Sequence, residues 1–573
     1  MTRRQRKVSL LLTAMMLLTL LTGCIVTPIA PTGGTTPAPT AAPATEPTKA
    51  AGDGIIWKGK ITIAPYMFGP VDESKNVVKP LLEEALLKYG YDVDLENVFI
   101  ENSQYAELLN VRIAAGDAPD IFESKSQTYM KEYYEQGSIK SWTKEFFIEK
   151  CPNIMNFINK GGVDGRLKDY VDMFWDFALI DGKMVTVPPF SEAGTMLPKV
   201  MLLRKDWLEN LGVKELPYTL DDFIKLMYRF AKEDPDRNGK DDTYGFSTSV
   251  IRAVFGAFYG YSSFPDPTYS SRIEFYNLDG KIQCGDILPT NKEALKILAQ
   301  CYKDGVIDPE FVAQNGENTG GYWALSQPFI NGRIGASCHA SIDHYRLPEV
   351  TGTEGPCAKE YYAVNGDYGF VYAPWPAGPE GNYGGWSLGP AVGIGENAVY
   401  NGAMDDEKLG AILAMLDIFA KDDDLALTGC YGIKGVTYEV TGPSDKPGVK
   451  TLVSNEELNA AGGSAYRGFY GGPSPLNETL IKMNYYNAPS IANIFNIQAQ
   501  PGYKGGYNRD VYETTASVSK YQQELSSLRD ETFIKIIRGE VGIDAYDAYV
   551  KDYLARGGQI LIDEAQAWWN SKH

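Results

Sequence analysis

Apolar and polar residues follow two alternating periods at the start of the body of this chain. Segments with a two-residue apolar period, typical of strands, alternate with segments whose apolar residues recur at helical spacing. In order they are the strand 55–64, the helix 77–89, the strand 93–100, the helix 103–115 and the strand 120–122. Because strands that alternate with helices form parallel sheets, the pattern predicts an α/β fold.

A different pattern precedes these elements. A basic cluster, an apolar run and a short segment of small residues follow one another at Arg3 to Lys7, Val8 to Leu20 and Leu21 to Cys24. This order is typical of an export signal. A transmembrane anchor is the weaker alternative, since the run is shorter than the roughly 20 apolar residues that span a bilayer.

Cys24 is the informative residue of this leader. The tetrapeptide Leu21-Thr22-Gly23-Cys24 resembles the lipobox of bacterial lipoproteins, which implies a signal peptide over 1–23 and acyl chains such as palmitate on Cys24. Residues 24–54 are rich in Thr, Pro, Ala and Gly, and this composition predicts a solvated tether. We therefore expect a lipid anchor on the extracytoplasmic face of a cell membrane, and this anchor suggests a Gram-positive-type cell surface.

Composition and charge narrow the class of protein. The chain has 573 residues, too many for one ordinary core, which favours two lobes. A net charge of −19, with no run of Lys and Arg after the leader, disfavours binding to nucleic acid. Three histidines offer little for a zinc site or a histidine-based triad. The six other cysteines permit disulfides without specifying them: Cys151, Cys284, Cys301, Cys338, Cys357 and Cys430.

Several motifs of the body resemble one family. The stretch YAELLNVRIAAGDAPDI at 105–121 is similar to the signature of family 1 extracellular solute-binding proteins, the sugar-type receptors of ABC importers. Further matches follow in the family's order at 180–188, 203–212, 217–223, 279–282, 302–311, 331–335 and 431–438. Together they look most like the large lipoprotein branch of oligosaccharide and alginate-type binders.

This resemblance implies a two-lobed, periplasmic-binding-protein-like fold of type II, with a ligand cleft between two α/β lobes. It would place lobe one at about 55–180 plus a segment near 320–390, and lobe two at about 190–310 plus much of 400–573. It also implies a monomer that captures a solute for ABC transporter permease subunits and that needs no catalytic group.

One acidic loop has the spacing of a metal site. Oxygen ligands stand at positions 1, 3, 5, 7 and 9, from Asp234, Asp236, Asn238, the backbone carbonyl of Lys240, and Asp242. EF-hand calcium loops use this spacing with glycine at position 6, here Gly239, but they end in a bidentate Glu at position 12, here Gly245. Alginate-binder-like members bind calcium at such a loop, so the resemblance supports structural calcium. The alternative is a solvated acidic turn.

Aromatic residues in predicted loops are candidates for sugar binding, because flat apolar rings suit the C–H faces of sugars. The candidates are Tyr66, Trp175, Tyr259, Tyr261, Trp375, Tyr383 and Trp386. We expect Trp175 and Trp386 to be the stacking platforms, and Arg467 to pair with the carboxylate of an acidic sugar. For each aromatic residue taken alone, packing in the core is the alternative.

Three functions compete. The favoured one is a membrane-anchored binding protein that captures a carbohydrate, in particular an oligosaccharide, and delivers it to an ABC permease. The first alternative is an extracellular polysaccharide-active enzyme, which would need two carboxylates about 5 or 9 Å apart, and no spacing singles out such a pair. The second is a surface carbohydrate receptor without transport.

Overall fold

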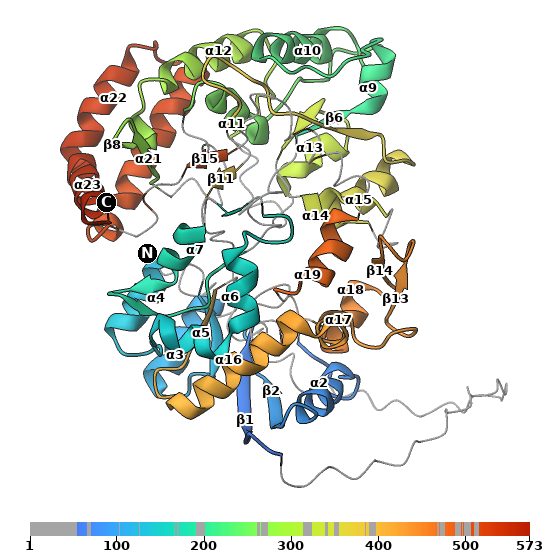
Figure 1. Cartoon of the computed structure of the whole chain (residues 1–573). Helices are drawn as coiled ribbons and strands as arrows, with labels where there is room; N and C mark the ends of the chain where they lie inside the picture. Colours follow the sequence, from blue (N-terminus) through green and yellow to red (C-terminus); the bar gives the residue numbers. More distant parts are fainter. Residues whose placement is uncertain are drawn as a thin grey trace, which may run out of the picture. The chain divides into compact units, whose positions relative to one another are not determined.

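The alternating pattern at the start of the body produces the expected parallel sheet (Figure 1). The elements are β1 Trp57–Ala64, α2 Val78–Leu87, β2 Tyr91–Asn97, α3 Tyr105–Ala115 and β3 Ile121–Ser124. Strand β1 pairs in parallel with both β2 and β3, so Ile61 and Ile63 are buried between neighbours. The predicted elements and the parallel pairing are confirmed, with bounds that differ by a few residues.

The computed structural model describes most of the unit Gly54–His573. Residues 1–53 lie outside the described residues, so the expectations for Cys24 and the tether stay predictions. The described residues are 54–65, 70–101, 104–124, 127–165, 167–168, 171–190, 201–260, 264, 273–312, 324–338, 342–348, 354–383, 386–388, 397–463, 465–466, 469, 476–487, 494, 497, 506–508, 511 and 515–572.

The first lobe is built on the parallel sheet, which β12 Asn397–Tyr400 extends antiparallel to β3 in the order β12-β3-β1-β2. Its other early elements are α4 Gln127–Glu135, α5 Lys144–Lys150, α6 Pro152–Asn159, α7 Val171–Phe177, β4 Leu179–Ile180 and β5 Lys183–Met184. Later segments add α16 Asp406–Lys421, α17 Asp423–Tyr431, β13 Tyr438–Thr441, β14 Gly448–Thr451, α18 Asn455–Ala460, α19 Glu478–Ile481 and the π-helical turn η5 Lys482–Tyr486.

The second lobe is built on an antiparallel sheet in the order β10-β6-β9, with β6 Met201–Arg204, β9 Ala336–Ser337 and β10 Phe370–Ala373. Its smaller strand pairs are β7 Phe275–Leu278 with β8 Lys281–Cys284, and β11 Trp386–Leu388 with β15 Gly506–Asn508. Its helices are α9 Lys205–Asn210, α10 Leu220–Lys232, α11 Thr248–Gly256, η3 Gly285–Ile287, α12 Asn291–Lys303, η4 Ala324–Ser326, α13 Gln327–Ile330, α14 Ile342–Tyr345, α15 Pro356–Asn365, α21 Val518–Ile537, α22 Ala545–Tyr553, η6 Leu554–Gly558 and α23 Gln559–Lys572.

Strand pairing corrects the expected lobe map. The segment 320–390 supplies β9 and β10 to the sheet of β6, whereas it was expected to return to lobe one. Conversely, 397–486 packs on the first lobe, and 518–572 on the second. Figure 1 shows the orange α16 beside α5 and α6, and the red α21–α23 beside α12 and β8. The order of motifs along a chain does not reveal which sheet a short strand joins.

A buried carboxylate fastens the returning α16 to α6. Asp417 accepts hydrogen bonds from the backbone N–H groups of Asn153 (2.8 Å) and Ile154 (2.9 Å) and from the Asn153 amide (2.6 Å). These backbone groups belong to the first turn of α6, whose own N-cap side chain makes no such bond. Burial raises the pKa of Asp417, although the hydrogen bonds act in the opposite direction. A residue on α16 thus caps a helix 264 positions earlier in the chain.

We expect Asp417→Ala to lower the free energy of unfolding by about 2 to 4 kcal/mol, because it leaves buried N–H donors unpaired. Chemical denaturation of the purified chain measures this loss. Asp417→Asn, which keeps one oxygen acceptor, should lose less. Asp445→Ala, at an exposed turn, is the matched control and should change the free energy by less than about 0.5 kcal/mol. Equal effects of Asp417→Ala and Asp445→Ala would contradict the capping role.

Candidate functional site

The acidic loop lies between α10 and α11 and is attached to the end of α9. Arg237 donates to the carbonyl of Asn210 (2.9 Å), and the Asn210 amide donates to the carbonyl of Pro235 (2.8 Å). Asp234, Arg237 and Gly239 all have positive φ, so the loop is a sequence of tight turns. Its conformation is therefore fixed by local turn geometry and two contacts with α9.

The oxygen atoms of this loop gather around Asn238. The Asn238 side-chain amide donates to Asp236 (2.7 Å) and to Asp242 (3.1 Å), while the backbone N–H groups of Asn238 and Gly239 both donate to Asp234 (3.1 Å each). Burial, followed by the nearby Asp234 and Asp242, raises the pKa of Asp236. Two carboxylates on one amide nitrogen mark a place that favours positive charge.

The twelfth position of the loop cannot supply a ligand. Gly245 is buried, and a side chain there would meet the backbone of Met227 at 2.7 Å. The carbonyl of Gly245 accepts from Ala336 at the start of β9, so this residue belongs to the sheet region. Among the described residues, no group of three or more His, Cys, Asp or Glu side chains converges closely enough to hold a metal ion.

The fold brings together two of the predicted aromatic residues. The rings of Tyr259 and Tyr383 lie 4.5 Å apart, centre to centre, at an angle of 87°. Tyr276, which sequence reasoning missed, lies 5.7 Å from Tyr259, and its hydroxyl donates to Glu274 (2.6 Å). Tyr259 and Tyr383 are half-buried, whereas Tyr276 is buried. A tyrosine cluster with two partly exposed rings therefore forms at the end of α11.

Tyr259 has a strained backbone. Its φ of 53° places it in the left-handed region just after α11, where helices usually have glycine. A non-glycine residue there costs about 1 to 2 kcal/mol. Residues held in such conformations cluster at binding sites, so the strain is a second reason to regard Tyr259 as functional.

Two of the aromatic residues predicted to bind sugar, one of them a predicted stacking platform, are buried in the cores. Trp175 is 4% exposed, with Lys144 over its ring at 4.3 Å and Phe147 packed edge-on against it. Trp375 is 2% exposed in the core of the second lobe. Since a sugar needs an accessible ring face, these positions correct the expectation for both residues. For both residues the alternative interpretation, packing in the core, accounts for their position.

The side chains of the other predicted ligand residues are outside what the structure describes. Tyr66, Tyr261 and Arg467 lie outside the described residues. Trp386 opens β11, where its backbone pairs with Gly506 of β15. Their roles stay predictions.

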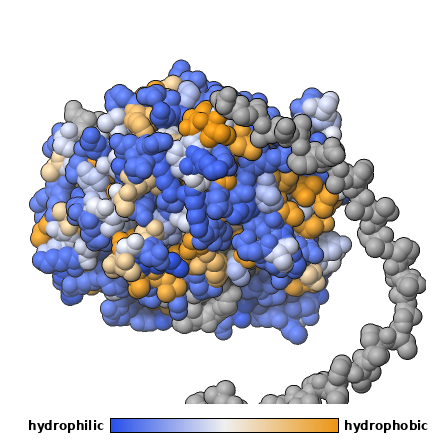
Figure 2. Space-filling view, turned by 90° about the horizontal axis from the view of Figure 1, so that it is seen from below, coloured by the Kyte–Doolittle hydropathy of each residue, from blue (hydrophilic) through white to orange (hydrophobic). Residues whose placement is uncertain are grey.

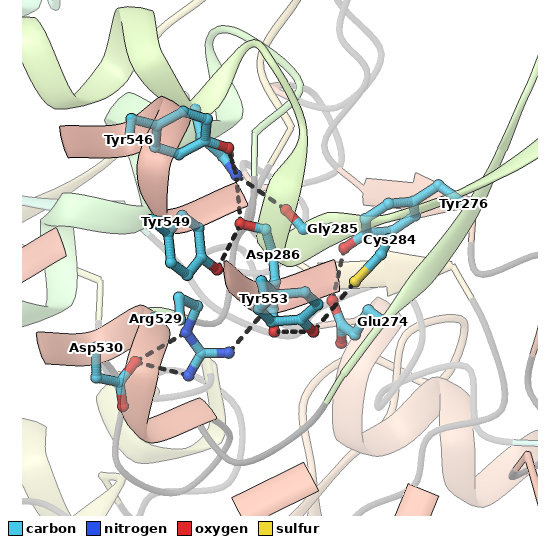
Figure 3. Close-up of polar contacts among 11 residues, drawn as sticks. Glu274, Tyr276, Cys284, Gly285, Asp286, Arg529, Asp530, Tyr546, Tyr549 and Tyr553 are labelled. Carbon is cyan, nitrogen blue, oxygen red and sulfur yellow. Dashed lines mark hydrogen bonds and ion pairs between the residues drawn. The ribbon is translucent and has the colours of Figure 1, made fainter. Parts of the chain in front are cut away.

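A buried polar network joins η3 to the C-terminal helices α21 and α22 (Figure 3). Asp286 in η3 accepts from Arg529 of α21 (2.9 Å) and from the hydroxyl of Tyr553 of α22 (2.8 Å). Neither Asp286 nor Arg529 has exposed side-chain surface. Burial raises the pKa of Asp286, and Arg529 and Tyr553 oppose that shift. The paired charges join segments 243 residues apart.

The network reaches the tyrosine cluster through Asn291. Its amide donates to the carbonyl of Gly285 (3.0 Å) and to the hydroxyl of Tyr546 (3.3 Å). Its amide oxygen lies so close to Gly260 that a side chain there would approach it to 2.7 Å. Gly260 follows Tyr259, so the network supports the backbone that presents Tyr259. No local sequence signal marks Asp286 or Arg529, because their partners are distant in the chain.

The cysteines add no site. The six cysteines whose pairing the sequence does not specify are all free thiols in the structure. Burial raises the pKa of Cys284 and Cys301, which makes their thiols unreactive. In the part of the chain that the structure describes, no helix is both long and apolar enough to cross a membrane.

The fold is similar to that of solved solute-binding proteins. Over 90% of the chain it is similar to a solute-binding protein from Bifidobacterium longum infantis associated with an ABC transporter and described as HMO-binding, with a TM-score of 0.60 at 15% identity and 99% coverage of that chain. An EF-hand mutant of the Streptococcus pneumoniae transporter protein FusA, in complex with fructo-nystose, gives 0.58 at 18% identity, with coverage of 90% and 99%. The expected periplasmic-binding-protein-like α/β fold is therefore confirmed.

Residues 72–260 match the model of the family described as bacterial extracellular solute-binding protein. Within this span the chain is similar to that family, as its motifs indicated. In Bacillus subtilis (strain 168), Lipoprotein LipO is 26% identical over 55% of this chain, and the chain spans 60% of LipO. The polygalacturonan/rhamnogalacturonan-binding protein YtcQ of the same organism is 24% identical over 82% of this chain and 85% of its own length.

We expect Arg529→Met to lower the free energy of unfolding by about 3 to 5 kcal/mol, since it leaves Asp286 buried without its cation. In Arg529→Met combined with Asp286→Asn, part of this loss should be recovered. The control is Arg556→Met, whose pairs with Asp552 and Glu524 are partly exposed and should contribute less than about 1 kcal/mol. Denaturant titration measures all three, and equal losses for both arginines would contradict the role of the buried pair.

Proposed function

We propose that this protein captures a carbohydrate, in particular an oligosaccharide, outside the cell and delivers it as a monomer to the permease subunits of an ABC transporter. The observation that carries the proposal is the likeness of fold over 90% of the chain to transporter receptors whose names specify sugars. YtcQ, named for binding polygalacturonan and rhamnogalacturonan, adds a sequence relative matched over most of both chains. Capture and release need two lobes and no catalytic group.

The tyrosine cluster supports this proposal. Tyr259 and Tyr383 each have a partly exposed ring. The neighbouring Tyr276 donates a hydrogen bond to the Glu274 carboxylate. Rings flanked by a few fixed polar groups are the surfaces that sugars bind. We assign these two tyrosines to the ligand site.

A lipid anchor on Cys24 completes the proposed function. The leader and the Thr- and Pro-rich segment 24–54 support it, as does the relative named Lipoprotein LipO. The anchor keeps the receptor on the extracytoplasmic face of the cell membrane, near its permease. Two or three acyl chains on one residue are sufficient for stable attachment.

We expect Tyr259→Ala and Tyr383→Ala each to weaken sugar binding by about tenfold, which corresponds to about 1.4 kcal/mol of lost ring contact. Tryptophan fluorescence against a panel of fructo-, galacturono- and milk-type oligosaccharides first finds the ligand, and calorimetry then compares the variants. Tyr362→Ala, which removes another partly exposed tyrosine, is the matched control. A wild-type protein that binds no mono- or oligosaccharide would overturn the proposed function.

Calcium in the acidic loop is the second element of the proposal. The donor set of Asp234, Asp236, Asn238, Asp242 and the Lys240 carbonyl consists of hard oxygens, which calcium prefers. Asp236 and Asp242 both accept from the Asn238 amide, and in the proposed site a cation would take the place of this shared donor. When bound, calcium would neutralise these carboxylates and stabilise the loop. The structural neighbour FusA has been solved as an EF-hand mutant, which indicates a loop of this kind in that protein.

We expect calcium to bind chelator-treated protein with measurable heat and to stabilise it by about 2.7 kcal/mol at a concentration 100 times the dissociation constant. Asp236→Ala should abolish both effects, because it removes a ligand at the centre of the loop. Asp241→Ala removes a carboxylate of the same loop outside the proposed ligand set and should preserve both. Calorimetry and thermal unfolding measure the effects, and wild-type protein without calcium heat would rule the site out.

A further inference from the structure

Apolar side chains are exposed where the body begins. Ile55 is 50% exposed and Ile56 is 68% exposed, the highest fraction for any large hydrophobic residue among those described. Leu87, at the end of α2, is also exposed. Gly90 lies in the turn after Leu87 and against Ile56. The backbone N–H of Ile56 donates to the carbonyl of Gly90 (2.7 Å). We call Ile55, Ile56 and Leu87 the entry patch.

One tryptophan and two lysines adjoin the entry patch in the sequence. Trp57 follows Ile56, and its partly exposed ring folds over Gly59, where any side chain would come within 2.7 Å of the ring. Lys58 pairs with Asp92 (2.6 Å), and Lys88 pairs with Glu84 (3.2 Å). Exposed aliphatic residues bordered by tryptophan and long cationic side chains have the chemistry of a surface that lies at a lipid interface.

The size of the entry patch favours lipid over protein as its occupant. A stable protein interface buries about 800 Å² on each partner, far more than three partly exposed aliphatic side chains provide. A bilayer needs no matching surface. Figure 2 views the molecule from below Figure 1 and shows apolar groups among mostly polar residues on that side. A shallow contact with lipid suits such a surface.

The position of the entry patch in the chain points the same way. Ile55 directly follows the segment 24–54, at whose start Cys24 carries the proposed lipid. A chain of that length reaches at most about 110 Å. The body is therefore confined near the bilayer, where an effective concentration on the order of millimolar makes even a weak apolar contact populated.

We propose that the entry patch docks on the surface of the membrane that holds the lipid anchor, so that Ile55, Ile56 and Leu87 enter the headgroup region. The inference rests on the proposed anchor and extends it from attachment to orientation. The neighbouring lysines are paired with carboxylates, so the contact is apolar and does not depend on anionic lipid. The body, acidic overall, gains no attraction from anionic lipid either.

The test uses the full lipidated chain in vesicles of phosphatidylcholine, with and without brominated acyl chains that quench nearby tryptophan. Partition of the protein into the detergent phase first establishes the anchor, so failure of the anchor is distinguished from failure of docking. We expect brominated lipid to quench a fluorescence component that disappears in Trp57→Phe. The variants Ile56→Glu and Leu87→Glu should each reduce this quenching at least fivefold, in the presence or absence of phosphatidylglycerol.

Val436→Glu is the matched control, because Val436 is 60% exposed and lies in the turn before β13. It should leave the quenching unchanged, and all four variants should bind sugar as the wild type does. Three results would overturn the proposal: an anchored protein without quenching of Trp57, quenching that survives both glutamate variants, or quenching that Val436→Glu reduces equally. Concentration-dependent dimers that disappear in Ile56→Glu, without quenching, would identify a second copy as the occupant instead.

Discussion

The arrangement of the second lobe depends on one buried charge. The guanidinium of Arg529 has no exposed surface, and such a group is stable only with carboxylates beside it. Asp286 provides one of them, so α21 and α22 must pack on the turn after β8. The same packing orders Asn291 and the backbone next to Tyr259. One ion pair thereby connects the C-terminal helices to the proposed sugar site.

The first lobe solves a similar problem in a different way. Helix α6 begins without a side-chain cap of its own, and Asp417 supplies one from the returning α16. In both lobes a polar group from a late segment completes an early one. The two contacts join residues 264 and 243 positions apart in the chain.

Function is assigned to surfaces that differ in character. The tyrosine cluster is strained, partly buried and supported by a polar network, as expected of a ligand site on a fixed scaffold. The entry patch is small, exposed and placed where the body begins. The acidic loop is held by α9 and gathers oxygen atoms around Asn238. The three surfaces are aromatic, aliphatic and acidic, and different segments of the chain form them.

The sequence by itself determined the first sheet, because β1 to β3 follow from local periodicity. Its contiguous motifs also indicated the resemblance to extracellular solute-binding proteins. It also indicated the acidic loop and two tyrosines that the fold brings together. Only the tertiary structure decided that Trp175 and Trp375 are core residues, since burial depends on segments distant in the chain. It also decided that β9 and β10 join β6, and that Asp286 pairs with Arg529. Short strands and isolated polar residues carry no local signal of their partners, so pairing across hundreds of residues is settled by packing alone.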